Sequence, residues 1–111
     1  MGAQFDANIS VDSGGFALAD HGMSSTLRDL CRVGLLVLND GRAFCEQVAP
    51  AAFIGDLHSQ PGDPSWPAEA AVSGMEPYYS SFWWGIGNDA RDLTGYGIHG
   101  QILCVAPEAG G

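Results

Sequence analysis

The strongest constraint on how this chain can fold is a cluster of aromatic residues in its last third. Five of the eleven aromatic residues lie within seven positions, in the run Tyr-Tyr-Ser-Ser-Phe-Trp-Trp from 78 to 84. Aromatic side chains bury large apolar areas and dominate both protein cores and interfaces. The fold must therefore place this segment in its core or on a surface that binds another molecule.

The composition is that of a globular protein, and its charge excludes several classes of partner. Hydrophobic residues make up 46% of the chain and charged residues 15%, which predicts one packed domain over residues 1–111. Thirteen acidic residues face four arginines and no lysine, so the formal net charge is -9. Nucleic acids are bound through clustered Lys and Arg, and anionic membranes attract the same residues. We expect neither as a partner.

The cysteines and the amino-terminal residues predict a cytoplasmic location. Cys31, Cys45 and Cys104 are odd in number and widely spaced, which indicates free thiols in a reducing compartment. Their apolar neighbours predict that these thiols are buried. The first ten residues lack the basic and apolar segments of a secretory signal, and the apolar run 33–38 is too short to cross a membrane.

Alternation and capping patterns predict the elements of the first third. Residues 5–11 alternate between apolar and polar side chains, which is typical of a strand. A turn at 12–15 and a returning strand at 16–19 would follow. The sequence Thr-Leu-Arg-Asp at 26–29 has the form of a capping motif, so we expect a short helix over 25–32.

The apolar run 33–38 has two interpretations. Because an Asn-Asp-Gly turn and a second apolar-rich run at 42–48 follow it, a β-hairpin is favoured. The alternative extends the capped helix through Leu38, since periodicity cannot separate helix from strand over so few residues. Gly34 and the Asp-Gly pair favour the hairpin.

The remaining elements complete an α+β fold. Pro50 predicts a helix over 51–57, and the prolines between 58 and 67 predict a loop, followed by a short helix over 67–73. The aromatic run is predicted as one strand, and 101–105 as the last core strand. We expect a small, mostly antiparallel sheet with two or three short helices packed on one face.

A single regular strand would divide the aromatic run between two faces. Tyr78, Phe82 and Trp84 would share one face, and Tyr79 and Trp83 the other, because successive side chains alternate. One set would then pack in the core. The other would be covered by a partner or would bind a ligand.

The leading hypothesis is a non-enzymatic domain that binds a small organic ligand, planar or cationic. Aromatic faces attract cations, and acidic residues in the glycine-rich loop that follows would add complementary charge. The predicted binding residues are Trp83, Trp84, Tyr78, Tyr79, Asp89 and Asp92. We expect a homodimer or larger oligomer, without a metal or another cofactor, since no His or Cys spacing indicates a metal site.

Two other functions stay open. The aromatic residues could form a protein–protein interface, either in a homo-oligomer or with a partner. Residues 82–89, followed by Gly100-Gln101-Ile102, are similar in outline to bacterial immunity proteins of the SMI1/KNR4 type, and this resemblance implies a protein-binding role. The chain could also be a small hydrolase or isomerase that uses His58 or His99 with a nearby acid.

Overall fold

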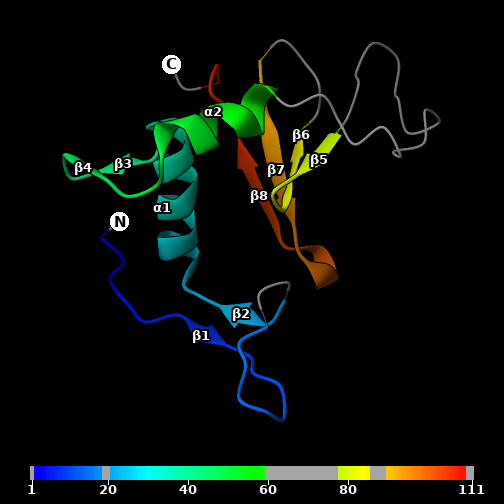
Figure 1. Cartoon of the computed structure of the whole chain (residues 1–111). Coiled ribbons are helices and arrows are strands. Elements are labelled where there is room, and N and C mark those ends of the chain that lie inside the picture. The colour runs from blue at the N-terminus through cyan, green and yellow to red at the C-terminus, as the bar shows by residue number, and fades with distance from the viewer. Residues whose placement is uncertain (1, 19–20, 60–77, 86–89, 110–111) are drawn as a thin grey trace.

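A computed structural model describes residues 2–18, 21–59, 78–85 and 90–109 (Figure 1). The helices in these ranges are α1 (Leu27–Leu38), α2 (Ala51–Ser59) and the 3-10 helix η2 (Ile98–Gly100). The strands are β1 (Asn8–Ile9), β2 (Met23–Ser24), β3 (Arg42–Ala43), β4 (Glu46–Gln47), β5 (Tyr78–Ser80), β6 (Trp83–Gly85), β7 (Leu93–Tyr96) and β8 (Ile102–Val105). All strand pairs are antiparallel, which confirms the predicted α+β class.

Four strands form the main sheet, in the order β5-β6-β7-β8. β7 and β8 pair over their full length, from Leu93 opposite Val105 to Tyr96 opposite Ile102. Because side chains alternate between the two faces of a sheet, this register determines which residues share a face. The predicted last strand at 101–105 is confirmed as β8.

Both helices pack on one face of this sheet, as predicted (Figure 1). α1 crosses β8 at Gly34, where a Cβ would stand 3.6 Å from side-chain atoms of both Leu103 and Val105. α2, predicted at 51–57, packs against β6, and the backbone of its Leu57 contacts β5. The core lies between the helices and the sheet, and its buried apolar side chains are Val37, Ile54, Leu57, Tyr78, Leu93 and Val105.

The helix α1 is longer than the predicted helix over 25–32, and the prediction of a hairpin that begins at residue 33 is wrong. Thr26 caps the helix as expected, since its Oγ1 atom accepts from the Asp29 amide at 3.1 Å. The Asp-Gly pair ends this helix and does not turn a hairpin. Asp40 has φ +52°, its amide donates to Val37, and the Gly41 amide donates to the Leu36 carbonyl at 2.8 Å. These two bonds form a Schellman C-cap, for which a positive φ is required.

A short hairpin, β3–β4, does follow α1, but it covers only part of the predicted 42–48 strand. Phe44 and Cys45 form its turn, with φ values of +49° and +68°. Cys45, Cys31 and Cys104 are free and exposed, so their predicted burial is wrong. Each thiol lies beside apolar residues in sequence, but neighbours in sequence do not determine which face of an element is buried.

The amino-terminal strand is also shorter than predicted. The turn at 12–15 forms, because the Asp12 carboxylate accepts from the Gly14 and Phe16 amides at 2.8 and 2.9 Å. The returning partner of β1 is β2, whereas the predicted strand at 16–19 makes a single bridge, between Val11 and Ala17. The predicted helix at 67–73, and the predicted loop beyond residue 59, lie outside the described residues. None of the helices in the described part of the chain could span a lipid bilayer.

Candidate functional site

The aromatic run folds as a hairpin and not as the single strand predicted from the sequence. Ser81 and Phe82 occupy the turn with φ values of +49° and +68°, which are the left-handed conformations of a two-residue hairpin loop. β5 then returns as β6, with Tyr79 opposite Trp84 and Ser80 opposite Trp83. The turn changes the expected faces, because it pairs residues that a continuous strand would separate.

Tyr78 and Trp83 lie on the face that the helices cover. The Tyr78 ring is buried beside Gly85, and its hydroxyl group donates to the Leu57 carbonyl oxygen at 2.6 Å. Burial raises the pKa of this phenol above its ordinary value of 10.0. Trp83 is half-buried against the core. These two predicted ligand-binding residues therefore stabilise the fold.

Tyr79 and Trp84 lie on the opposite face, together with residues from β7 and β8. The Tyr79 and Trp84 ring centroids are 4.9 Å apart, and the Trp84 and Tyr96 centroids are 6.3 Å apart with the rings nearly perpendicular. The register aligns two further pairs on this face, Thr94 with Cys104 and Tyr96 with Ile102. We call this surface the open face; its residues are Tyr79, Trp84, Thr94, Tyr96, Ile102 and Cys104.

Of the two acids predicted to complete the site, Asp92 lies among the described residues. Asp89 lies outside the described residues. Asp92 comes directly before β7 and is half-buried. No metal-ligating group of three or more His, Cys, Asp or Glu side chains occurs within the described ranges.

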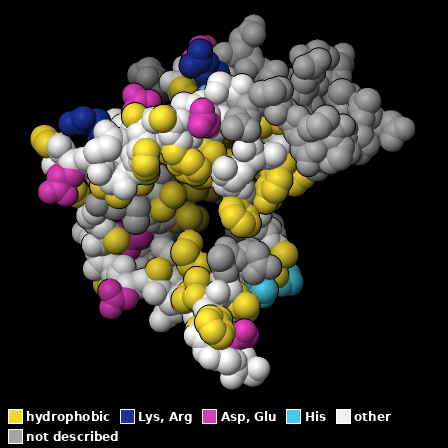
Figure 2. Space-filling model, viewed as in Figure 1, with side chains coloured by type: hydrophobic (Ala, Val, Ile, Leu, Met, Phe, Trp, Pro, Cys, Tyr) yellow, Lys and Arg dark blue, Asp and Glu magenta, His cyan; other side chains and the backbone are white. Residues whose placement is uncertain are grey.

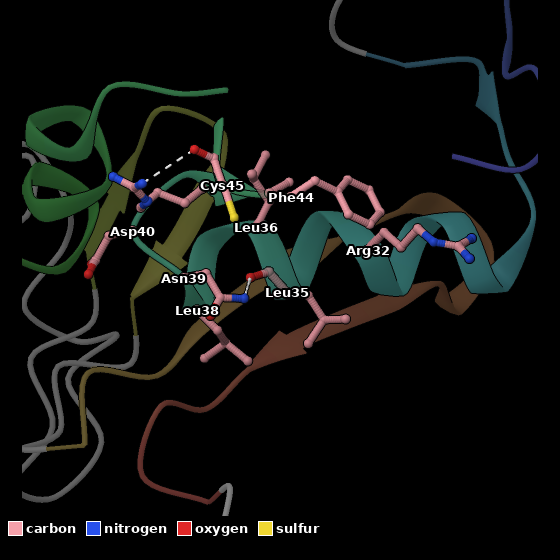
Figure 3. A pocket seen from close by; sticks show the side chains of 10 residues that line it. Arg32, Leu35, Leu36, Leu38, Asn39, Asp40, Phe44 and Cys45 are labelled. Carbon is pink, nitrogen blue, oxygen red and sulfur yellow. Dashed lines mark hydrogen bonds between the residues drawn. The ribbon is translucent and has the colours of Figure 1, made fainter. Parts of the chain in front are cut away.

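A pocket lies beside the carboxyl-terminal half of α1 and the β3–β4 hairpin (Figure 3). It has a volume of about 680 Å³ and is lined by Arg32, Leu35, Leu36, Leu38, Asn39, Asp40, Arg42, Ala43, Phe44 and Cys45. Several of its polar groups already bind nearby backbone: the Asn39 amide donates to the Leu35 carbonyl at 2.7 Å, and Arg42 donates to Cys45. This pocket was not predicted, because it depends on α1 continuing to Leu38, which was the less favoured interpretation of the run 33–38.

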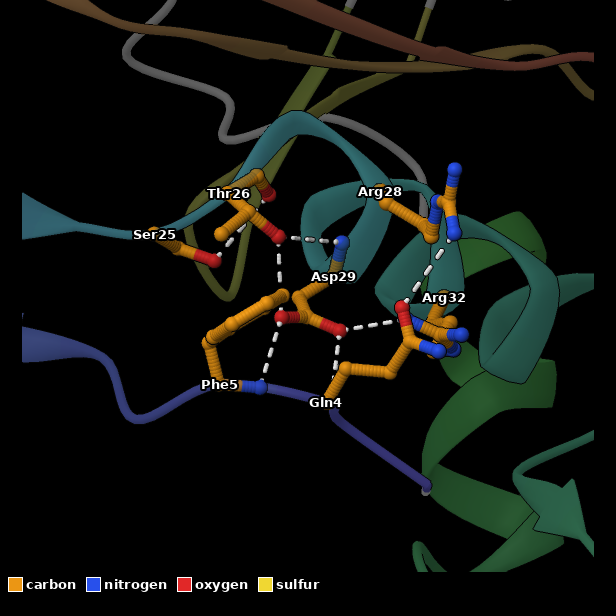
Figure 4. A network of polar contacts seen from close by, with 7 residues as sticks. All are labelled: Gln4, Phe5, Ser25, Thr26, Arg28, Asp29 and Arg32. Atoms are coloured by element: carbon orange, nitrogen blue, oxygen red, sulfur yellow. Dashed lines mark hydrogen bonds and ion pairs between the residues drawn. The ribbon is translucent and has the colours of Figure 1, made fainter.

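A polar network anchors the amino-terminal segment to the start of α1 (Figure 4). The Asp29 carboxylate accepts from the Gln4 amide at 2.9 Å, from the Phe5 amide at 3.2 Å and from the Thr26 hydroxyl at 2.9 Å, and it pairs with Arg32. The Gln4 hydrogen bond contributes most to lowering the pKa of Asp29 below 3.8, while burial opposes it. The capping motif revealed the local role of Asp29 but not this contact with a segment 25 residues away.

The histidines considered for catalysis occupy different positions. The Nδ1 atom of His58, at the end of α2, lies 3.0 Å from the Arg91 carbonyl oxygen. His99 is exposed in η2, between β7 and β8, and has a φ of +64°. Among the residues that the structure describes, the hydrogen-bond partner of His58 is therefore a backbone oxygen and not the carboxylate that was predicted to pair with it.

Known proteins resemble this chain along almost its whole length. No family model matches it. It is 35% identical over 108 residues to a 6-aminohexanoate-dimer hydrolase of Paenarthrobacter ureafaciens, a match that covers 96% of this chain and 28% of that protein. The solved structure of a putative 6-aminohexanoate-dimer hydrolase from Bacillus anthracis matches with a TM-score of 0.75 and 28% identity, over 93% of this chain and 26% of the other. The chain thus spans about a quarter of the length of these proteins.

These likenesses correct the leading functional prediction. The prediction of a non-enzymatic ligand-binding domain is wrong, because the proteins that are similar to this chain in sequence and fold are named as hydrolases. The alternative that named a hydrolase is closer. The outline shared with immunity proteins lies within residues 82–102, whereas the likeness to hydrolases covers nearly the whole chain.

Proposed function

We propose that this chain supplies a sheet-and-helix part of a hydrolase that cleaves the amide bond in short chains of aminocarboxylic acid units, with the 6-aminohexanoate dimer as the first substrate to test. The observation that carries the proposal is the 35% identity over 108 residues to a protein named for that activity. The backbone of the Bacillus anthracis structure has a similar fold, with a TM-score of 0.75, and this similarity also supports the proposal.

Amide hydrolysis needs an activated nucleophile or water, a proton for the departing amine and donors for the developing oxyanion. His58 is directed at a backbone carbonyl, and the match spans about a quarter of each relative. We therefore assign the main reacting groups to the part of the hydrolase outside the match. This chain would hold the sheet and α1 in place beside them.

The exposed apolar surface supports a role within a larger protein. In the described ranges, large hydrophobic side chains are more often exposed than buried, and Leu27, Phe44 and Ile98 are each more than two-thirds exposed. Figure 2 shows apolar side chains over much of the surface, from the amino-terminal hairpin to the helices. Extended apolar surface of this kind usually marks contact with further polypeptide. The exposed free thiols favour a reducing, cytoplasmic location for that assembly.

A chimera tests the proposal directly. The 108 matched residues of the Paenarthrobacter ureafaciens hydrolase are replaced by the aligned residues of this chain, and release of 6-aminohexanoate from the dimer is measured by amine detection. We expect the chimera to hydrolyse the dimer, because this chain would restore the sheet and helix that the relative needs. The 111-residue chain alone is assayed beside it and is expected to be inactive.

The control is the same chimera with Leu93→Asp, which introduces a charge at a fully buried position and should abolish folding and activity together. A chimera that is soluble, has native circular dichroism and still leaves the dimer intact would contradict the proposed function. Hydrolysis by the isolated chain would instead contradict the assignment of the reacting groups to the rest of the protein.

A further inference from the structure

The pocket beside α1 and the β3–β4 hairpin gathers positive charge in an acidic chain. The described residues that line it include Arg32 and Arg42, two of the four arginines in the sequence, and one acid, Asp40. Two positive charges and one negative charge give this lining a formal charge of +1, against -9 for the whole chain. Salt screens charges beyond about 8 Å, so a ligand in the pocket responds mainly to these near groups. The lining therefore favours an anionic group over a cationic one.

Arg42 is the cation of the pocket that has hydrogen-bonding capacity to spare. Its guanidinium group donates to the Cys45 carbonyl oxygen at 3.4 Å, which is long for a hydrogen bond. Arg32, by contrast, already pairs with the Asp29 carboxylate. A guanidinium group has five N–H donors, and no acid among the described residues pairs with that of Arg42. Arg42 can therefore bind a carboxylate through two parallel N–H···O bonds.

The apolar part of the lining is suited to an aliphatic chain. Leu35 and Phe44 are each more than half exposed, so both side chains offer apolar surface to a ligand. Figure 3 shows Leu36 and Phe44 between Arg32 and Cys45. Apolar side chains thus extend from the Cys45 end of the pocket, where the available guanidinium group donates. The volume of about 680 Å³ is within the range of about 300 to 1,000 Å³ that is typical of small-molecule sites.

We propose that this pocket binds short linear carboxylates, with the carboxylate on Arg42 and the aliphatic chain against Leu36 and Phe44. The 6-aminohexanoate expected from the proposed reaction belongs to this class, but the ligand class follows from the lining alone and does not depend on that reaction. The main reacting groups are assigned to the part of the hydrolase outside the match, so the pocket is a second site. A ligand bound there would link the β3–β4 hairpin to α1.

Hexanoate is the probe that tests this site. It is titrated into the ¹⁵N-labelled 111-residue chain, and the amide chemical shifts are followed by NMR. We expect a saturable shift at the amides of Phe44 and Cys45 and none at the amides of β7. Acetate keeps the carboxylate and hexylamine keeps the chain, so each should bind at least about tenfold more weakly than hexanoate, because each lacks one of the two contacts.

Three substitutions at exposed positions test the assigned contacts. Arg42→Gln should weaken hexanoate binding about tenfold or more, because the carboxylate loses its charged donor. Arg28→Gln is the matched control, since Arg28 also makes a 3.4 Å bond, to Gln4, but is not among the residues that line the pocket. Asp40→Asn should strengthen hexanoate binding, because it removes a like charge from the lining.

The same titration in the chimera tests the site within a whole hydrolase. There the readout is the rate at which Cys45, which lines the pocket, is alkylated by the neutral reagent iodoacetamide, followed by mass spectrometry. Hexanoate should slow this reaction, and Arg42→Gln should remove the protection. If the isolated chain does not fold, the chimera alone provides the test.

The outcomes separate this site from the proposed function. Hexanoate binding that is unchanged by Arg42→Gln, or is equalled by acetate or hexylamine, would overturn the inference. Binding in the isolated chain that is lost in the folded chimera would show that further polypeptide fills the pocket, and the inference would be wrong. A chimera that protects Cys45 but leaves the dimer intact would support the pocket and contradict the function. A chimera that hydrolyses the dimer but shows no protection would do the reverse.

Discussion

The hydroxyl group of Tyr78 donates to the carbonyl oxygen of Leu57 at 2.6 Å, and this bond joins the aromatic hairpin to α2. The two residues are 21 positions apart, and both belong to the buried core. The carbonyl lies near the end of α2, where the last carbonyl groups of a helix lack partners within the helix. The tyrosine hydroxyl group therefore satisfies a helix end and positions β5 at the same time.

Tyr78→Phe should lower the free energy of unfolding by about 1 kcal/mol, because the ring remains but the hydrogen bond to Leu57 is lost. Urea denaturation followed by tryptophan fluorescence measures this change. Tyr79→Phe is the matched control, since Tyr79 lies on the open face and is 40% exposed. Equal effects of the two substitutions would show that the bond to Leu57 does not stabilise the hairpin.

The same tyrosine predicts a loss of stability at alkaline pH. Burial raises the pKa of Tyr78 above 10.0, so the unfolded chain releases this proton at a lower pH than the folded chain. The stabilisation is complete below pH 10 and decreases as the pH rises towards the raised pKa. Urea midpoints measured across this range should fall less steeply for Tyr78→Phe than for the natural chain.

Gly85→Ala should displace the Tyr78 ring. A Cβ at position 85 would stand only 2.0 Å from a ring atom, and the ring cannot withdraw because it is buried and bonded to Leu57. We expect a loss of about 1 to 3 kcal/mol in the free energy of unfolding, as for other overpacked cores. Gly95→Ala is the control, because its nearest contacts would be at 3.9 and 4.0 Å. A stable Gly85→Ala protein would show that the ring has another position available.

The class of fold could be predicted from the sequence because local patterns determine most of its elements. The capping motif at Thr26, the helix after Pro50 and the short apolar run of β8 all depend on neighbouring residues. The run 33–38 could not be settled locally, since Asp40 and Gly41 can turn a hairpin or end a helix. Packing decided it: Val37 is buried in the core and Gly34 meets β8.

The candidate site was less predictable, because each face is defined by pairing between strands. A two-residue turn at Ser81 and Phe82 places Tyr78 with Trp83, whereas a continuous strand would separate them. The sequence of the turn, Ser-Phe, contains neither Gly nor Asn, which usually mark such a turn. The similarity to hydrolases could not be predicted from sequence motifs either. In the described ranges, no motif indicated an acid–base pair that includes His58.

Gly34→Ala should stabilise the protein by roughly 0.5 to 1 kcal/mol, because alanine is a better helix former. The added Cβ would meet Leu103 and Val105 at 3.6 Å, which is ordinary van der Waals contact. Gly34→Leu should instead destabilise, since its longer side chain would force α1 away from β8. Thermal unfolding of the two variants measures both effects. If both substitutions destabilise equally, α1 packs more tightly on β8 than these distances indicate.

Asp29→Asn should release the amino-terminal segment from α1. The carboxylate accepts from the Gln4 and Phe5 amides through different oxygen atoms, whereas asparagine has only one accepting oxygen and can therefore keep only one of the two bonds. We expect faster hydrogen exchange at the Gln4 and Phe5 amides, while the α1 amides beyond the first turn keep their protection. Asp12→Asn is the control, because a single oxygen atom of Asp12 accepts both bonds in its local turn and asparagine retains one such oxygen.

Acid should have the same effect as this substitution. The hydrogen bond from Gln4 is the main cause of the lowered pKa of Asp29, so the carboxylate stabilises the fold above pH 3.8, and this contribution disappears as the pH falls through the lowered value. The exchange rates of the Gln4 and Phe5 amides, corrected for intrinsic rates, should rise over this interval in the natural chain. In Asp29→Asn the corrected rates should stay constant, because no carboxylate remains to titrate. A parallel rise in both proteins would assign the acid sensitivity to another group.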